Sequence, residues 1–163
     1  IILAQFVSKW SASERLLGME SRSDENIIVE ISKDNLNSES LKEKINLKGS
    51  GCIVSFLGIT RDIDDGVEVK HLEFDAWEKQ LEVVLYDISK TAINEFSVNC
   101  VGISHRVGIV GPSEPIVAIH VASPHRAEGF RACSWIIDEL KAQAPLWKKE
   151  VTVLGTTWKG GLG

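Results

Sequence analysis

Arginines, histidines and lysines gather in four short stretches of the sequence, and these residue types bind anions. Guanidinium and ammonium groups donate charge-assisted hydrogen bonds to phosphate and carboxylate oxygens. The four stretches contain Arg61, His105-Arg106, His125-Arg126 and the lysines Lys141, Lys148 and Lys149. Each stretch also has an ordinary interpretation, as a surface ion pair or a capping residue, and residue type alone leaves both open.

His125 and Arg126 lie where a helical pattern begins. The first turn of a helix has unpaired N–H groups and a partial positive charge, which together favour a bound anion. The pair is therefore a candidate phosphate or carboxylate site. The alternative is that Arg126 pairs with Glu128 on the surface, and Arg61 has a similar alternative in the acidic stretch 62–65.

Lys141 and Lys148 flank Pro145, which ends the helical pattern that begins at Arg126. Lys141 lies beside the apolar stripe of that helix and Lys148 lies on the next extended segment, so the turn can bring the two together. A lysine near a second cation has a lowered pKa and can act as an acid, a base or a nucleophile. The alternative is that both are solvated surface lysines.

The other residues that bind metals or form disulfides give no such pattern. His71 and His120 fall in strand patterns, where partly buried, hydrogen-bonded histidines are expected, and no histidine pair has metal-ligand spacing. Cys52, Cys100 and Cys133 are widely spaced and form no C-x-x-C pair. We expect neither a metal nor another cofactor, and we interpret the cysteines as small apolar residues in a reducing cytoplasm.

Composition restricts the class of protein. The 163 residues are 44% hydrophobic and 25% charged, which is typical of globular proteins, and the net charge of −5 argues against nucleic-acid binding. The longest apolar runs are far shorter than the ~20 residues of a membrane-spanning helix. The first residues lack a basic segment followed by a long apolar one, so we expect no signal peptide and a cytoplasmic location.

Hydrophobic periodicity predicts an α+β protein, with helices packed on an antiparallel or mixed sheet in a two-layer sandwich. Residues 1–25 are expected to form an arm or linker with one short helix at 13–19, and 26–163 a single domain. The predicted strands are 26–31, 51–60, 67–77, 98–107, 116–123 and 147–154, and the predicted helices begin at 37, 78 and 126.

Three of these elements carry expectations about burial. The nearly continuous apolar run 51–60 predicts a strand covered on both faces. In the helix 126–144, the apolar stripe is Phe130, Cys133, Ile137, Leu140 and Ala144. Alternation in 147–154 predicts that Trp147, Val151 and Val153 face inward, with Lys148, Glu150 and Thr152 on the opposite face.

Six segments, taken in order, resemble the large, catalytic subunit of the molybdopterin synthases. They are IVSFLGITRD, LEFDAW, HRVG, SPHRAEGF, IDELKAQAP and PLWKKE. The similarity extends over residues 49–158, about two thirds of the chain. It implies an α+β fold with a hammerhead-like subdomain, assembled as a homodimer. It also implies that each protomer binds one small ubiquitin-like sulfur-carrier subunit, which gives a heterotetramer.

The resemblance further implies a reaction. The Gly-Gly thiocarboxylate of the carrier enters a pocket and donates sulfur to cyclic pyranopterin monophosphate, and two transfers make the dithiolene of molybdopterin. By motif position, Arg61, His125 and Arg126 correspond to residues that hold the pterin substrate, Lys141 and Lys148 to the two lysines at the reacting centre, and Phe56 to an apolar residue that lines the site. Molybdenum enters after this step.

One feature departs from the family pattern. Family members often carry an arginine in a C-terminal arm that reaches across the dimer, whereas this sequence has Lys159 after Trp158 and no arginine beyond it. The alternative function is a non-catalytic α+β module that binds an anion or small molecule. Such a module would keep Arg61 and His125-Arg126 and make no use of the two lysines.

Overall fold

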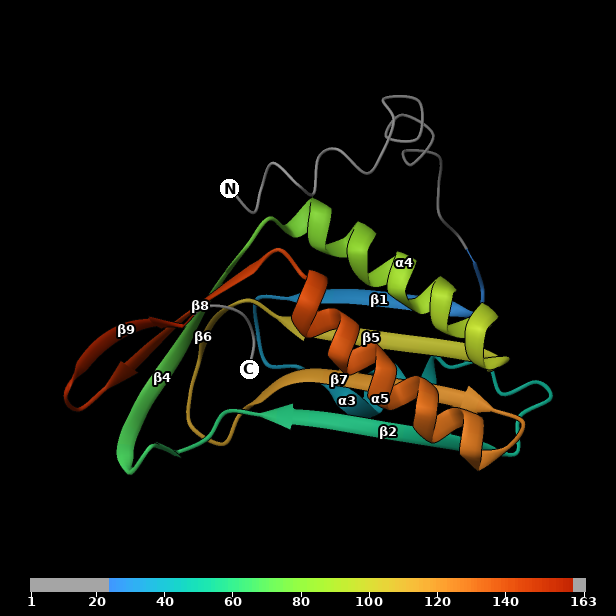
Figure 1. The fold of residues 1–163 in the computed structure, drawn as a ribbon, viewed down its shortest axis with the longest axis horizontal. Coiled ribbons are helices and arrows are strands. Elements are labelled where there is room, and N and C mark those ends of the chain that lie inside the picture. Colours follow the sequence, from blue (N-terminus) through green and yellow to red (C-terminus); the bar gives the residue numbers. More distant parts are fainter. Residues whose placement is uncertain (1–23, 160–163) are drawn as a thin grey trace.

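The computed structural model describes residues 24–159, so the predicted helix at 13–19 and nearly all of the predicted arm lie outside the described residues. A four-stranded mixed sheet forms the centre (Figure 1). Its order is β1 (Ile27–Ser32), β5 (Cys100–Arg106), β7 (Pro115–Ser123) and β2 (Cys52–Ile59). β1 is parallel to β5, and the other neighbours are antiparallel.

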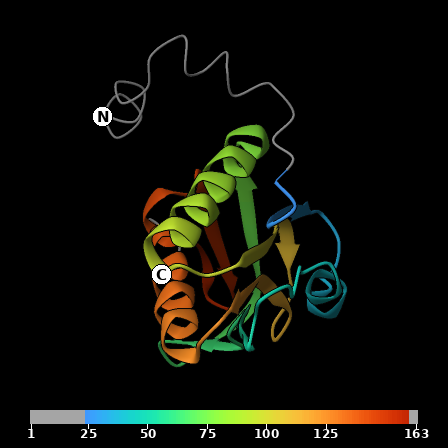
Figure 2. The ribbon, with the colours of Figure 1, turned by 90° about the vertical axis from the view of Figure 1, so that its right-hand side faces the viewer.

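Helices cover this sheet unequally. The long helices α4 (Glu78–Phe96) and α5 (Arg126–Gln143) lie together on one face, and the short helix α3 (Ser38–Glu43) lies on the other (Figures 1 and 2). The main core lies between the two long helices and the sheet, and its fully buried members include Leu81, Leu85, Ile103, Ile119 and Ile136. The predicted α+β class and mixed sheet are confirmed.

A second, antiparallel sheet projects from one end of these layers (Figure 1, left). β4 (Val67–Ala76) is its central strand and pairs with β3 (Ile63–Asp64), β6 (Gly108–Val110) and β8 (Leu146–Thr152). β9 (Gly155–Lys159) pairs with β8. The short strand β6 was not predicted, because the Val107-Gly108 turn that precedes it ends the visible pattern.

The expectation that strand 51–60 is covered on both faces is wrong. β2 is an edge strand, and only Val54 within it is buried. Phe56, Leu57 and Ile59 are 37%, 47% and 55% exposed. α5 packs on one face of β2, while no described strand pairs with its outer edge. An apolar run shows that a strand is hydrophobic, but an exposed edge strand and a buried central strand can have the same apolar sequence.

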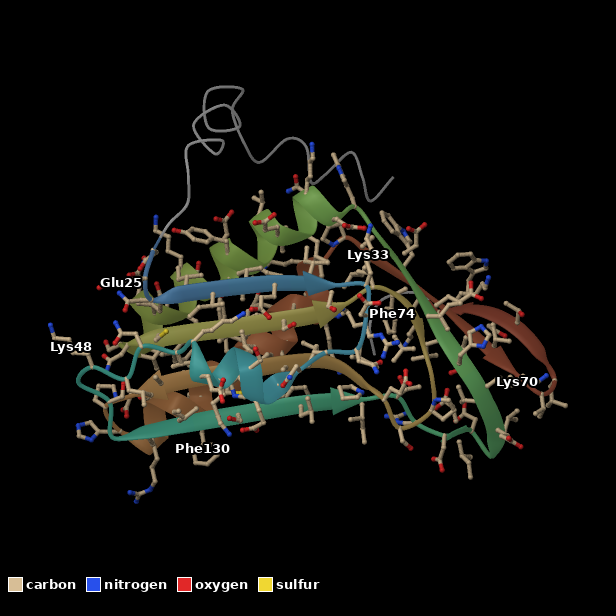
Figure 3. All side chains as sticks on the ribbon, turned by 180° about the vertical axis from the view of Figure 1, so that it is seen from behind. Glu25, Lys33, Lys48, Lys70, Phe74 and Phe130 are labelled. Carbon is tan, nitrogen blue, oxygen red and sulfur yellow. The ribbon has the colours of Figure 1, made fainter. Side chains whose placement is uncertain are left out.

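The assignment of Phe130 to the core stripe of α5 is also wrong. Phe130 is 62% exposed and points away from the sheet beside β2 (Figure 3), whereas Cys133 and Leu140 of the same stripe are buried. The helix turns Gly129 toward β2 instead, and a Cβ there would lie 2.9 Å from Val54 Cγ2. Hydrophobic periodicity does not count glycine as a core residue, so it could not predict that α5 approaches β2 at Gly129. The apolar stripe was therefore predicted one position too far round the helix.

On β8 the predicted alternation is correct but its two faces are exchanged. Leu146 and Glu150 are buried and Lys148 is half-buried, whereas Trp147 is 45% exposed. The pairing with β4 explains this, because Lys148 lies opposite Phe74 and residues paired across antiparallel strands share a face. The face that contains Phe74 turns toward the first sheet, so the polar set of β8 turns inward with it.

This register predicts unequal effects of truncation on stability. We expect Leu146→Ala to lower the free energy of unfolding by about 2–5 kcal/mol, as for other buried leucines. Trp147→Ala removes a larger side chain from the exposed face and is expected to cost less. Urea unfolding of the two variants measures both values. A larger loss for Trp147→Ala would mean that the assigned face of β8 is wrong.

Candidate active site

A cavity of about 520 Å³ lies where the second sheet meets the end of β2 and the C-terminal end of α5. The end of β2 and the following loop form one wall, α5 forms another, and β4, β8 and β9 close the third side. Apolar side chains such as Phe56, Phe74 and Leu140 line its interior. The cavity therefore collects residues from segments that are far apart in the sequence.

The charges around the cavity are unbalanced. The charged residues that line it are Arg61, Asp64, Lys141, Lys148, Glu150 and Lys159. Four cations and two carboxylates leave a local charge of +2, in a chain whose net charge is −5. A concave site with one sign of charge in excess attracts ligands of the opposite sign. The cavity is therefore suited to an anionic ligand.

Lys148 reaches this cavity because of its position on β8. It lies opposite Phe74 of β4 on one side and opposite Lys159 of β9 on the other. Burial lowers the pKa of Lys148, the charge of Lys159 lowers it further, and the Glu150 carboxylate opposes both. Lys141 enters from the last turn of α5. Within residues 24–159, neither lysine forms an ion pair.

The carboxylates of the cavity are bound by other cations. Lys159 Nζ lies 3.1 Å from Asp64 Oδ2 and 3.4 Å from Glu150 Oε1. Arg61 Nη1 lies 3.1 Å from Asp64 Oδ1. Hydrogen bonds from Lys159 and then Arg61 hold the pKa of Asp64 below its usual value, and the hydrogen bonds of Lys159 to Asp64 and Glu150 raise the pKa of Lys159. Asp64 and Glu150 were not predicted as site residues, although Glu150 falls in the PLWKKE segment.

Two uncharged polar groups also line the cavity. The buried Thr60 Oγ1 has no hydrogen-bond partner among the described residues. His105 Nδ1 lies 2.8 Å from the carbonyl oxygen of Arg106, so Nδ1 carries the proton, and burial lowers the pKa of His105 to about 4. His105 is therefore neutral at pH 7. Nη1 of the adjacent Arg106 lies 2.8 Å from Glu114 Oε2, so Arg106 forms an ion pair within the fold.

Only part of the predicted site comes together in one chain. The structure gathers Phe56, Arg61, Lys141 and Lys148 at the cavity. His125 caps the N-terminal end of α5 and Arg126 is its first residue, and both are exposed. The 18-residue helix is about 27 Å long. His125 and Arg126 therefore lie a helix length from the lysine that enters at its other end.

The remaining candidates have structural roles. His120 is buried, and its ring nitrogens lie 2.7 Å from Ser55 Oγ and 2.9 Å from the carbonyl oxygen of Ser38. Cys100 and Cys133 are buried free thiols, as expected. Among residues 24–159, no group of three or more histidines, cysteines and carboxylates is placed to hold a metal ion. No helix in this part of the chain is both long enough and apolar enough to cross a membrane.

Known proteins are similar to this chain in both sequence and fold. Residues 31–143 match the family described as MoaE protein. The molybdopterin synthase catalytic subunit of Thermoplasma volcanium is 34% identical over 126 residues, which cover 77% of this chain and 92% of that protein. The resemblance drawn from the sequence motifs is confirmed by these matches.

Solved structures of related proteins have a similar fold. The crystal structure of molybdopterin synthase from Staphylococcus aureus has a TM-score of 0.77 and 29% identity, and the match covers 85% of this chain and 99% of that one. A complex of subunits 1 and 2 of molybdopterin-converting factor from Helicobacter pylori has a TM-score of 0.66 at 21% identity, covering 80% and 88%, and this likeness concerns the fold. Sequence and structure together place this chain in the MoaE protein family.

Proposed function

We propose that this protein is the catalytic subunit of a molybdopterin synthase. It would transfer sulfur from the C-terminal thiocarboxylate of a small ubiquitin-like carrier to cyclic pyranopterin monophosphate, a step in molybdenum cofactor biosynthesis. The observation that carries the proposal is the cavity of local charge +2, into which Lys141 and Lys148 project without ion-pair partners among the described residues. Both reactants are anions, so a cavity with this charge suits both.

The chemistry requires positioning and charge stabilisation from the protein. The carrier's sulfur bonds to a carbon of the precursor and displaces an oxygen substituent there, which gives a thioester between carrier and precursor. Water then attacks the acyl carbon and the acyl C–S bond breaks. The sulfur stays on the precursor as a thiolate, and the carrier leaves with a carboxylate. Lys148 and Lys141 would stabilise the oxyanion that develops during that attack. The sulfur arrives on the carrier, and burial raises the pKa of Cys133 to about 11, so this thiol does not serve as a nucleophile.

The chain's thiols also bear on where the reaction occurs. Cys52, Cys100 and Cys133 are all free. Free thiols persist in the reducing cytoplasm. We place the protein there.

A dimer would complete the site. β2 presents an unpaired edge, and α5 runs beside it from Arg126, near the start of β2, to Lys141, near its end (Figure 1). If two copies pair antiparallel along this edge, the start of one β2 lies beside the end of the other. His125 and Arg126 of one copy would then approach Arg61 and the lysine cavity of its partner. This pairing joins the two halves of the predicted substrate site.

A second function is a binding module without turnover, as considered from the sequence. The exposed His125 and Arg126 suit an anion site of that kind equally well. The lysine variants described next separate the two functions, because a binding module needs no pair of lysines without ion-pair partners at its cavity.

We expect Lys141→Ala and Lys148→Ala each to lower the rate of molybdopterin formation by about 10²–10³, because each removes one preorganised cation from the developing oxyanion. Lys149→Ala is the matched control. Its side chain points to the other face of β8, where it pairs with Glu73 and lies 5.7 Å from the Trp158 ring. Single-turnover assays with thiocarboxylated carrier measure the three rates. Equal loss in all three variants would contradict the catalytic assignment.

The carrier's tail can be tested separately. We expect a carrier that lacks its terminal Gly-Gly to bind about tenfold more weakly or worse, because the backbone hydrogen bonds of the inserted tail are lost. Calorimetry with the full-length and truncated carriers measures the two dissociation constants. Equal affinities would mean that the tail does not enter the cavity.

The shared site predicts complementation between two impaired variants. Arg126→Ala is expected to weaken precursor binding by about tenfold or more, because a charge-assisted hydrogen bond is lost. When Arg126→Ala and Lys148→Ala chains are unfolded together and refolded in equal amounts, the mixed dimers contain one unaltered site each. At a precursor concentration well below KM, we expect about one quarter of the wild-type rate from a mixture in which half the dimers are mixed. A rate no higher than that of the separate variants would show that each site belongs to one chain.

A further inference from the structure

We propose that Lys159 is a positioning residue, which binds the two carboxylates of the cavity and thereby leaves Lys148 without a carboxylate partner. The proposal deepens the proposed function and rests on it. Lys159 is the last described residue of β9. Its two described ion pairs are both with carboxylates that line the cavity.

The strand register places two lysines side by side. Lys148 and Lys159 lie directly opposite each other on β8 and β9, on the same face of the sheet. Like charges in such a pair destabilise the sheet. Asp64 and Glu150 offset this cost, and both form ion pairs with Lys159 rather than with Lys148. The neutralising charge is therefore concentrated on one lysine of the pair.

Glu150 is the carboxylate that would otherwise bind Lys148. It is 9% exposed and lies two residues from Lys148 on the same face of β8. A carboxylate this buried is stable only beside a cation or hydrogen-bond donors. Lys159 supplies that cation at 3.4 Å. Without Lys159, the next cation on that face of β8 is Lys148.

Asp64 is held in the same way, since Arg61 binds one of its oxygens and Lys159 the other. The remaining ionisable groups at the cavity are Lys141 from α5 and the neutral His105 from β5. Neither of these supplies a negative charge. Lys148 is therefore left as an ammonium group that an entering anion can bind without first displacing a carboxylate.

The test compares Lys159→Met with Lys159→Arg, and uses Lys149→Met as the matched control on the outer face. Competitive labelling of amines with an acylating reagent, followed by mass spectrometry of the peptide that contains Lys148, gives the titration of that lysine without any substrate. In Lys159→Met we expect the Lys148 titration to move to higher pH, because the repelling charge of Lys159 is lost and the freed Glu150 stabilises the charged form of Lys148. Lys159→Arg and Lys149→Met should leave it in place.

The same variants are then assayed for sulfur transfer. We expect Lys159→Met to lower the rate roughly tenfold, within the range for residues of one ionic network. Adding Glu150→Gln to Lys159→Met removes the competing carboxylate and should move the Lys148 titration back and recover part of the rate. The double variant also separates this effect from a loss of folding, which a second substitution at the same place would not repair.

An unchanged Lys148 titration in Lys159→Met would overturn the proposal, as would a double variant that titrates like Lys159→Met alone. The titration is independent of the proposed reaction. If the wild-type protein transferred no sulfur, the proposed function would be wrong, and the labelling result would still decide what Lys159 does.

Discussion

The antiparallel pairing of β8 with β4 and β9 is the constraint on which the site depends. It turns Lys148 and Glu150 toward the first sheet, sets Lys159 beside Lys148, and leaves Lys149 on the outer face. A slip of one residue in this register would exchange the two faces and replace Lys148 by Lys149 in the cavity. The chemistry of the cavity is therefore set by backbone hydrogen bonds between strands, and the packing of α5 then brings Lys141 to the same place.

The sequence predicts the elements well and their surroundings less well. The helix 78–96 and the six longer strands are found because periodicity and turn residues are local signals, whereas the short strands β3, β6 and β9 are not. The exposure of β2 and of Phe130 depends on what packs against them, and nothing within either segment records that. The exchanged faces of β8 have the same origin. Lys148 and Glu150 turn inward there and line the cavity, whereas hydrophobic patterning assumes that polar side chains turn outward.

The site was predicted in part for related reasons. Lys141 and Lys148 are separated by a short turn, so their proximity follows from local structure, and motif resemblance added Arg61 and Phe56. Asp64, Glu150 and Lys159 act through contacts between β3, β8 and β9, which only the assembled sheet reveals. His125 and Arg126 share a motif with α5 but lie at its far end. Motifs suggest candidate residues, while the length of a helix decides which of them can meet within one chain.

The unpaired edge of β2 has a consequence for the newly made chain. An exposed strand edge is a template on which another chain can add a strand, and proteins usually protect such edges with charged residues or proline. β2 reads CIVSFLGI and contains neither. Until something covers this edge, the chain carries a site for aggregation along most of one strand. Rapid assembly would then protect the polypeptide during synthesis, and the yield of soluble protein would depend on how quickly chains meet their partners.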